Sequence, residues 1–270
     1  MLDDPADRVA VVTGGASGIG KAIASELLRR GMTVVIADIE ADAIERAVGE
    51  TGAIGMRCDV GSAESVASVA ADVKRLFGRV DLFCSNAGVA STGRIEDMTD
   101  PDWDWLLGVN LYGVIHGIRA FLPLLREAPG GGHLAVTASM SGLHATPGIG
   151  GYTVTKYAVM GLCETLALEL ESEGANVGLT LLCPGPVSTN LGASQRNRRR
   201  QGSSALVDSD LEHTEGGAQL NWLDPAEVAG ILLRAIERGD LYAFTHPEWE
   251  PLVAKRHRAI EAAFERAGAS

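Results

Sequence analysis

Cysteine and aromatic residues are scarce in this sequence. Its 270 residues include four cysteines, at positions 58, 84, 163 and 183, and aromatic side chains make up 5%. No two cysteines form a CxxC pair, and the six histidines show no HxH or HxxxH spacing. Disulfide frameworks and metal sites depend on such spacings, so we expect reduced core thiols and no bound metal.

Positive charge and long apolar runs are also in short supply. The 23 Lys and Arg residues stand against 35 Asp and Glu residues, which gives a net charge of -12. An acidic surface repels phosphate, so neither nucleic acid nor an anionic membrane is the expected partner. No uninterrupted apolar run reaches the roughly 18 residues of a membrane span, and no basic region opens the N-terminus. We expect a cytoplasmic protein that acts on a small molecule.

What the sequence does have is a regular alternation of short apolar runs and longer stretches of helical periodicity. The apolar runs are rich in Val, Ile and Leu, as in parallel strands that are covered on both faces. We expect strands at 8–13, 33–38, 53–60, 80–85, 133–139, 176–183 and 241–246. Helices are expected at 18–30, 40–50, 62–77, 101–126, 150–172, from Asp224-Pro225 onward and at 248–267.

This alternation predicts an α/β fold: a doubly wound, Rossmann-like parallel sheet of about seven strands with helices on both faces. We interpret residues 1–270 as a single domain, because no second core is needed. In such folds the ligand crevice lies at the carboxyl ends of the strands. The polar segment at about 186–222 lacks a clear period and is long for a connection, so we interpret it as a substrate lid.

A glycine-rich loop joins the first expected strand to the first helix. The segment TGGASGIG (13–20) lets the main chain approach a pyrophosphate, and the helix that follows supplies unpaired N–H groups. An ordinary glycine-rich turn is the alternative, but the position between strand and helix favours dinucleotide binding. The expected cofactor contacts are Gly14, Ser17, Gly18, Ile19 and Gly20.

Two acidic residues close the next two expected strands. Asp38 stands 18 residues beyond Gly20, where a carboxylate accepts hydrogen bonds from the adenosine ribose and repels a 2′-phosphate, which favours NAD over NADP. Asp59, with Val60 beside it, is expected at the adenine. Helix capping is the alternative role for each carboxylate. The fourth expected strand ends in small residues that let the main chain pass close to the cofactor: Asn86, which braces the turn, Ala87 and Gly88.

A tyrosine and a lysine share one face of a later helix. Tyr152 and Lys156 are four residues apart. A nearby ammonium favours the phenolate, which brings a general base toward neutral pH. Ser139 stands 13 residues before Tyr152, at the end of the fifth expected strand, where its hydroxyl can orient a substrate oxygen. Each feature alone is common in helices and turns.

In their order along the chain, these motifs resemble those of the short-chain dehydrogenase/reductase family in its single-domain form. The resemblance covers about residues 8–190 and rests on TGGASGIG, SNAG, the Asn of GVNLYG, the Ser-x12-Tyr-x3-Lys spacing and PGPVST. Two positions depart from the family pattern. Ser85 stands where the family usually has Asn, and Pro186 stiffens the entrance to the expected lid.

The resemblance implies specific roles for the residues of these motifs. Tyr152 is the implied general acid/base, Ser139 holds the substrate oxygen, and Lys156 lowers the pKa of Tyr152 and binds the nicotinamide ribose. Asn110 is implied to position a water for proton relay. The segment implied to line the nicotinamide contributes Pro184, Gly185, Val187 and Thr189.

Several residues outside the motifs have two open interpretations. The basic cluster of Arg196, Arg198, Arg199 and Arg200 either clamps an anionic substrate or faces solvent. His144 either borders the substrate or lies exposed in a loop, and Trp249 either covers the substrate mouth or packs the last helix.

The expected function is that of an NAD-dependent oxidoreductase that interconverts a secondary alcohol and a ketone. The lid and the apolar loop at 143–149 suggest a bulky cyclic, aromatic or steroid-like substrate, and the C-terminal stretch resembles that of bacterial family members that oxidise lignin-derived aryl alcohols. A non-catalytic dinucleotide-binding sensor or scaffold is the alternative, against which the complete Ser/Tyr/Lys set argues. The resemblance also implies a homotetramer or dimer, packed through 101–126 and 150–172.

Overall fold

Seven runs of mostly apolar residues form one parallel sheet. The computed structural model describes residues 5, 7–198, 203–209, 212 and 219–268. The strands pair in the order β3-β2-β1-β4-β5-β6-β7, and every pairing is parallel. They are β1 (Val9–Thr13), β2 (Thr33–Asp38), β3 (Ile54–Arg57), β4 (Leu82–Ser85), β5 (Gly132–Thr137), β6 (Val177–Cys183) and β7 (Tyr242–Phe244).

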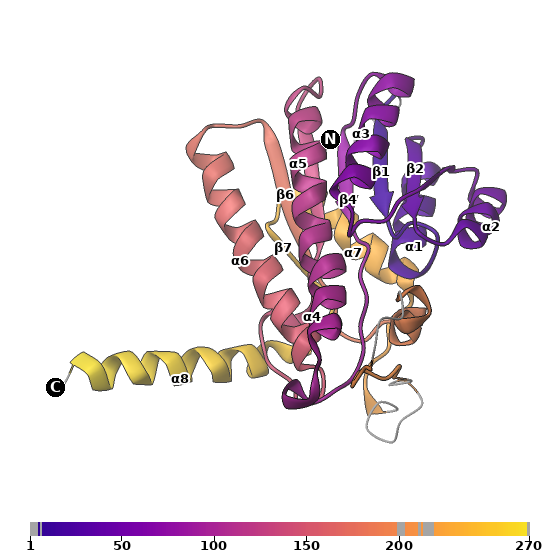
Figure 1. The fold of residues 1–270 in the computed structure, drawn as a ribbon. Helices are drawn as coiled ribbons and strands as arrows, with labels where there is room; N and C mark the ends of the chain where they lie inside the picture. The colour runs from indigo at the N-terminus through magenta and orange to yellow at the C-terminus, as the bar shows by residue number, and fades with distance from the viewer. Residues whose placement is uncertain (1–4, 6, 199–202, 210–211, 213–218, 269–270) are drawn as a thin grey trace.

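Helices cover both faces of this sheet (Figure 1). One apolar cluster joins the sheet to α3 (Ala63–Phe77), α5 (Gly113–Arg126) and α6 (Gly150–Ser172). A second cluster joins the opposite face to α1 (Gly18–Arg29), α2 (Ala41–Thr51) and α7 (Pro225–Arg238). This arrangement confirms the predicted single-domain, doubly wound fold.

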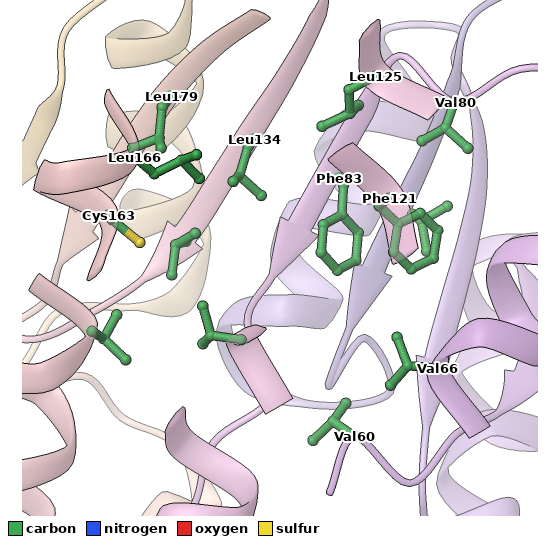
Figure 2. Packing of buried hydrophobic residues seen from close by; sticks show 14 of the residues in the cluster. Val60, Val66, Val80, Phe83, Phe121, Leu125, Leu134, Cys163, Leu166 and Leu179 are labelled. Atoms are coloured by element: carbon green, nitrogen blue, oxygen red, sulfur yellow. The ribbon is translucent and has the colours of Figure 1, made fainter. Parts of the chain in front are cut away.

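Alternation along the strands divides the side chains between the two clusters. In β1, Val9 and Val11 face the first cluster, whereas Ala10 and Val12 face the second. Within the first cluster, the rings of Phe83 and Phe121 stack with their centroids 4.1 Å apart, as Figure 2 shows. Gly117 of α5 makes room for this pair, because a Cβ there would lie 2.7 Å from the Phe83 ring. The core that fixes the strand ends is therefore closely packed.

Two expected elements have different bounds in the structure. The strand expected at 53–60 stops at Arg57, and the edge strand β3 is largely exposed, so Asp59 and Val60 lie in the connection to α3. The helix expected at 101–126 is divided into α4 (Asp100–Leu107), a π-helical segment (Gly108–Tyr112) and α5. A π-helical segment changes the direction of the side chains that follow it, and such segments are frequent at functional sites.

The stretch Asp100–Arg126 is also long and apolar enough to cross a membrane, judged by length and composition alone. Its apolar residues include Leu106, Phe121 and Leu125, which are completely or almost completely buried in the chain's own core. Packing against the sheet and its neighbouring helices therefore accounts for this composition.

The last helix, α8 (Glu250–Gly268), extends away from the sheet (Figure 1). None of its described residues is buried. At its start, the guanidinium of Arg256 lies over the ring of Tyr157 in α6, 5.2 Å from the ring centroid. This contact joins the beginning of α8 to α6, and the rest of the helix stands clear of the fold.

Candidate active site

A cleft of about 630 Å³ opens at the carboxyl ends of the central strands. This is the position at which doubly wound sheets bind their ligands. Many of the residues expected at the cofactor line it: Gly14, Ser17, Gly18, Ile19, Asp38, Asp59, Val60, Asn86, Ala87, Gly88, Tyr152, Lys156 and Thr189. The structure therefore brings most of the predicted cofactor residues together in one cleft.

The glycine-rich loop turns sharply between β1 and α1. Gly14 has a φ of +63°, and a Cβ there would come within 2.8 Å of the Ala87 main chain. Gly20 is buried beneath the loop, where a Cβ would lie 2.1 Å from the carbonyl oxygen of Gly14. Its expected direct contact with a cofactor is therefore replaced by a packing role, because Gly20 lets α1 begin close against the loop.

Asp38 connects the end of β2 to this loop. Its Oδ2 accepts a hydrogen bond from the main-chain N–H of Ala16 at 3.1 Å, and its Oδ1 accepts one from Glu40 at 3.2 Å. A carboxylate has about four acceptor positions, so Asp38 can still accept bonds from ribose hydroxyls. The residue holds the loop in place and leaves a negative charge at this end of the cleft.

Asn86 braces the chain between three strands. Its Nδ2 donates to the carbonyl of Thr13 at 3.1 Å, and its Oδ1 accepts from the Thr137 hydroxyl at 3.0 Å. The Thr13 hydroxyl in turn accepts bonds from the main-chain N–H groups of Asn86 and Ala87. The bracing expected of Asn86 is thus observed, and Thr13 and Thr137 are partners that the sequence did not single out.

Asn110 lies in the π-helical segment and is completely buried. Its amide donates to the carbonyl of Val89 at 2.9 Å and to the Thr155 hydroxyl at 3.1 Å, and it accepts from the N–H of Val89 at 2.8 Å. Both amide hydrogens are therefore used within the protein. The side chain positions the segment after β4 against α6.

Tyr152 and Lys156 line the cleft together with Asp38, and Ser139 lies beside Tyr152 without lining the cleft itself. Ser139 is two residues beyond β5, where its hydroxyl caps a short turn by accepting from Ser141 N at 3.1 Å and donates to the Pro184 carbonyl at 3.4 Å. Lys156 is 3% exposed and donates from Nζ to the Thr137 carbonyl at 2.8 Å. Its Nζ lies 5.6 Å from the centroid of the Tyr152 ring.

Burial sets the protonation of these groups. It raises the pKa of Tyr152 to about 12, although a hydrogen bond with Ser139 acts in the opposite direction. Burial also lowers the pKa of Lys156 to about 8. Burial thus moves the Tyr152 pKa away from neutrality in the protein alone, and a lowering of this pKa by Lys156 stays a prediction for the site with its cofactor bound.

The segment after β6 leads to the cleft, but the predicted cofactor residues Pro184, Gly185 and Val187 are not among the residues that line it. A Cβ at Gly185 would lie 2.6 Å from the ring of His246, so glycine allows the main chain to pass this buried side chain. Val187 is buried and pairs with Leu223 through an isolated bridge. The main chain from Pro184 thus reaches Thr189, which lines the cleft.

The described part of the expected lid crosses the cleft and is fastened on both sides. Two arginines at the end of its 3-10 helical segment (Asn190–Asn197) form ion pairs: Arg196 lies in the last turn, and Arg198 directly follows the segment. Arg196 pairs with Glu40 at 2.8 Å, and Arg198 pairs with Asp102 of α4 at 2.6 Å. Arg198 also lies over the ring of Trp105 at 5.5 Å.

These contacts decide part of the earlier alternative for the basic cluster. Arg198 is 6% exposed, so the expectation that it faces solvent is wrong, and its partner Asp102 is completely buried. Arg199 and Arg200 lie outside the described residues. The sequence did not indicate Glu40 or Asp102, because their partners are far away along the chain.

His144 and Trp249 contact each other. Their ring centroids lie 5.8 Å apart in an edge-on arrangement, and Trp249 lies at the same distance from the ring of His246. Trp249 also packs against the core cluster that α6 covers. The loop before α6 is therefore joined to the segment that leads into α8.

All four cysteines are buried and free, and burial raises the pKa of three of them to about 12: Cys84, Cys163 and Cys183. Among the residues that the structure describes, no group of three or more His, Cys, Asp or Glu side chains is placed to hold a metal ion.

Comparison with protein families gives a match to the short chain dehydrogenase model over residues 8–200. Among solved structures, the chain is similar to a short-chain dehydrogenase/reductase of Burkholderia phymatum in complex with NAD. The two are 34% identical, the match covers 96% of each chain, and the TM-score is 0.89.

Two curated relatives are similar over most of their length. A C alpha-dehydrogenase of Sphingobium sp. is 32% identical over 271 residues, which cover 96% of this chain and 87% of the relative. A 3beta-hydroxysteroid dehydrogenase of Eggerthella lenta is 34% identical over 218 residues, which cover 78% of this chain and 83% of the relative.

Proposed function

Because the chain belongs to the short-chain dehydrogenase/reductase family of oxidoreductases, we propose that it interconverts a secondary alcohol and a ketone with NAD as its cofactor. One observation carries this proposal. A single cleft has the glycine-rich loop and Asp38 at one end and Tyr152 and Lys156 at the other. Groups that fit a dinucleotide and groups that can move a proton therefore share one space.

The fit to a dinucleotide rests on the shape and charge of the cleft. The main chain at Gly14 and Gly18 is open to a pyrophosphate, and the N-terminus of α1 supplies positive dipole there. Asp38 at the end of β2 suits the ribose hydroxyls and opposes a 2′-phosphate. Bound in this cleft, the nicotinamide would supply the carbon that gives up or accepts the hydride.

The chain's own residues orient the substrate and move the proton. In ketone reduction, the Ser139 hydroxyl positions the carbonyl oxygen and Tyr152 donates a proton to it. The pKa of about 12 keeps Tyr152 protonated at neutral pH, which suits this acid role. In alcohol oxidation the phenol must first lose its proton, so this direction is favoured as the pH rises.

Lys156 and Asn110 support this proton transfer from opposite sides. Lys156 remains mostly charged at neutral pH and is anchored on the Thr137 carbonyl, from which it can reach a ribose hydroxyl. Because both amide hydrogens of Asn110 are taken, the water proposed for the relay would bind the main-chain carbonyl of the π-helical segment. Asn110 itself then acts by holding that segment in place.

We assign the substrate to a class of bulky, neutral alcohols with a cyclic, aromatic or steroid-like body. The name of one relative, a 3beta-hydroxysteroid dehydrogenase, supports this class. The His144 and Trp249 rings add an aromatic surface beside the loop that leads to Tyr152.

A panel of alcohols and ketones, each assayed with NAD and with NADP, tests the proposal. We expect NADH formation with cyclic or aryl secondary alcohols, and loss of about 10³-fold or more in turnover for Tyr152→Phe, the upper range of general acid–base catalysis. NADH titration followed by fluorescence serves as the control, since this variant should still bind the cofactor. Unchanged turnover in Tyr152→Phe would contradict the mechanism. Tight NADH binding without turnover of any panel member would favour a sensor or scaffold instead.

We also propose that the chain forms a homodimer or homotetramer through α5 and α6. Large apolar side chains on the π-helical segment and α6 remain exposed in the single chain, including Tyr112, Val154 and Leu168 at 52%, 44% and 66%. Covering such a surface is a common driving force for association. Sedimentation equilibrium should give a multiple of 28.2 kDa, and a species of that mass alone would contradict the proposal.

A further inference from the structure

The lid places an arginine at the adenosine end of the cleft. Arg196 lines the cleft together with Asp38 and Glu40. Among the described residues that line it, the other cations are Lys156, which is bonded to the Thr137 carbonyl at the catalytic end, and Arg198, which pairs with Asp102. Of the three cleft-lining cations, Arg196 is therefore the one that is joined, through Glu40, to the segment that directly follows Asp38.

Glu40 holds this arginine firmly. The Nε and Nη2 atoms of Arg196 donate to Glu40 Oε1 at 3.1 and 2.8 Å, and Nη1 donates to the carbonyls of Ala193 and Asn190 at 2.6 and 3.3 Å. These bonds use four of the five N–H donors of a guanidinium. Asn197 Nδ2 adds a bond to Glu40 Oε1 at 2.9 Å.

The position of Glu40 makes this pairing unusual. Glu40 is the N-cap of α2, yet its side chain forms no capping bond to that helix. The carboxylate is directed to the lid instead, 156 residues away along the chain. Hydrogen bonding and attraction from Arg196 also lower the pKa of Glu40, so it stays ionised at neutral pH.

We propose that Glu40 is a second determinant of cofactor choice: it neutralises Arg196 and fixes its guanidinium, so that the lid offers no free cation to a 2′-phosphate. This inference rests on the proposed dinucleotide function. Asp38 repels the phosphate directly, and Glu40 withholds the residue that would attract it. Removal of the Glu40 charge leaves Arg196 beside the ribose with its charge uncompensated.

Fluorescence titration of the full-length chain with NADH and with NADPH tests this inference without any need for turnover. The readout is the ratio of the NADPH Kd to the NADH Kd, because a looser lid would weaken both cofactors and leave the ratio unchanged. In Glu40→Gln we expect this ratio to fall about 5-fold, the size of one partly exposed charge interaction. The effect should fade at high salt, which screens exposed charges.

Two further variants assign the effect to Arg196. In Glu40→Gln/Arg196→Met the ratio should return to the wild-type value. Glu237→Gln is the matched control, because Glu237 also pairs with an arginine, Arg30, at similar exposure but on α7, and the ratio should not change.

The outcomes separate this inference from the function on which it rests. NADH binding to the wild type with an unchanged ratio in Glu40→Gln would overturn the inference alone. A fall that persists in the double variant would also overturn it, because Arg196 would not be the cause. Failure of the wild type to bind either dinucleotide would overturn the proposed function and this inference together.

Discussion

The two ends of the cleft differ in how far their charged and polar side chains are exposed to water. At the adenosine end, Asp38, Glu40 and Arg196 are partly exposed, and their interactions are hydrogen bonds and ion pairs within reach of water. At the proposed catalytic end, Lys156 and the neighbouring Ser139 are 3% and 7% exposed. Charge can therefore select the ligand at the first end, whereas burial controls protonation at the second.

This difference changes how each end should respond to mutation. Exposed ion pairs contribute little to stability, because water screens them, but they still attract or repel a charged ligand. Burial of an ionisable group disfavours its charged form. It therefore shifts the pKa of the group and makes the free energy of unfolding depend on pH. Substitutions at the two ends should therefore separate binding preference from stability.

The largest effect is expected for Lys156→Met. Turnover should fall about 10³-fold, in the range of a lost acid–base group, because the charge beside Tyr152 and the proposed ribose contact are both removed.

The same substitution should also change how the free energy of unfolding depends on pH. Between pH 8 and about 10.5 the unfolded wild type keeps a proton on Lys156 that the folded chain has released, so its unfolding free energy rises with pH.

The measurement is the difference in unfolding free energy between wild type and Lys156→Met from pH 7 to 11. This difference cancels the contribution of groups that titrate alike in both proteins, such as the Cys84 thiol, whose pKa depends on burial alone. We expect the wild type to gain about 3 kcal/mol relative to the variant over this range, as a shift of about 2.5 pKa units implies. If the difference in unfolding free energy did not change with pH, burial would not lower the pKa of Lys156.

The next largest effect is expected where the lid meets α4. Burial alone would raise the pKa of Asp102, but hydrogen bonds from Thr99, Ser204, Ala205 and Arg198 hold it below its usual range. Asp102→Asn leaves the Arg198 guanidinium buried without its anion and should cost about 3 kcal/mol of unfolding free energy.

Glu40→Gln breaks the exposed ion pair between the lid and α2 and should cost less than about 1 kcal/mol of unfolding free energy. Urea denaturation measures both unfolding free energies. An equal loss in the two variants would contradict the proposed difference between the buried Asp102–Arg198 pair and the exposed Glu40–Arg196 pair.

An effect smaller than that of Asp102→Asn is expected in the glycine-rich loop. In Gly20→Ala the new Cβ would collide with the Gly14 carbonyl, which must move and carry the pyrophosphate-facing main chain with it. We expect the NADH Kd to rise about 10-fold, equivalent to about 1.4 kcal/mol. Gly49→Ala in α2 is the control, since nothing lies within 4 Å of its Cβ position and NADH binding should not change.

Local patterns were enough to predict the sheet and the residues at its edge. The strand expected at 33–38 matches β2, and Asp224-Pro225 opens α7 with a capping box, because strand and cap signals lie within a few residues of each other. The glycine-rich loop, Asp38 and Asn86 were found in the same way. Their roles follow from the position at which a strand ends.

Features that depend on distant parts of the chain were missed. The π-helical segment around Asn110 was read as continuous helix, because its apolar residues fit that period equally well. The Glu40–Arg196 and Asp102–Arg198 pairs leave no periodic trace. The burial that raises the Tyr152 pKa was also missed, because the Tyr/Lys spacing indicates proximity, whereas the degree of burial is set by the whole fold.

The projecting helix α8 has a practical consequence for handling the protein. Trypsin sites at Lys255, Arg256 and Arg258 follow one another on a helix without buried residues. Among the residues that the structure describes, all that line the cleft precede position 199, so cleavage within α8 would release a short peptide and leave this cleft lining uncut. Trypsin digestion of the protein at low concentration should therefore remove α8 first. Slower cleavage at a higher protein concentration would indicate that a neighbouring molecule shields this helix.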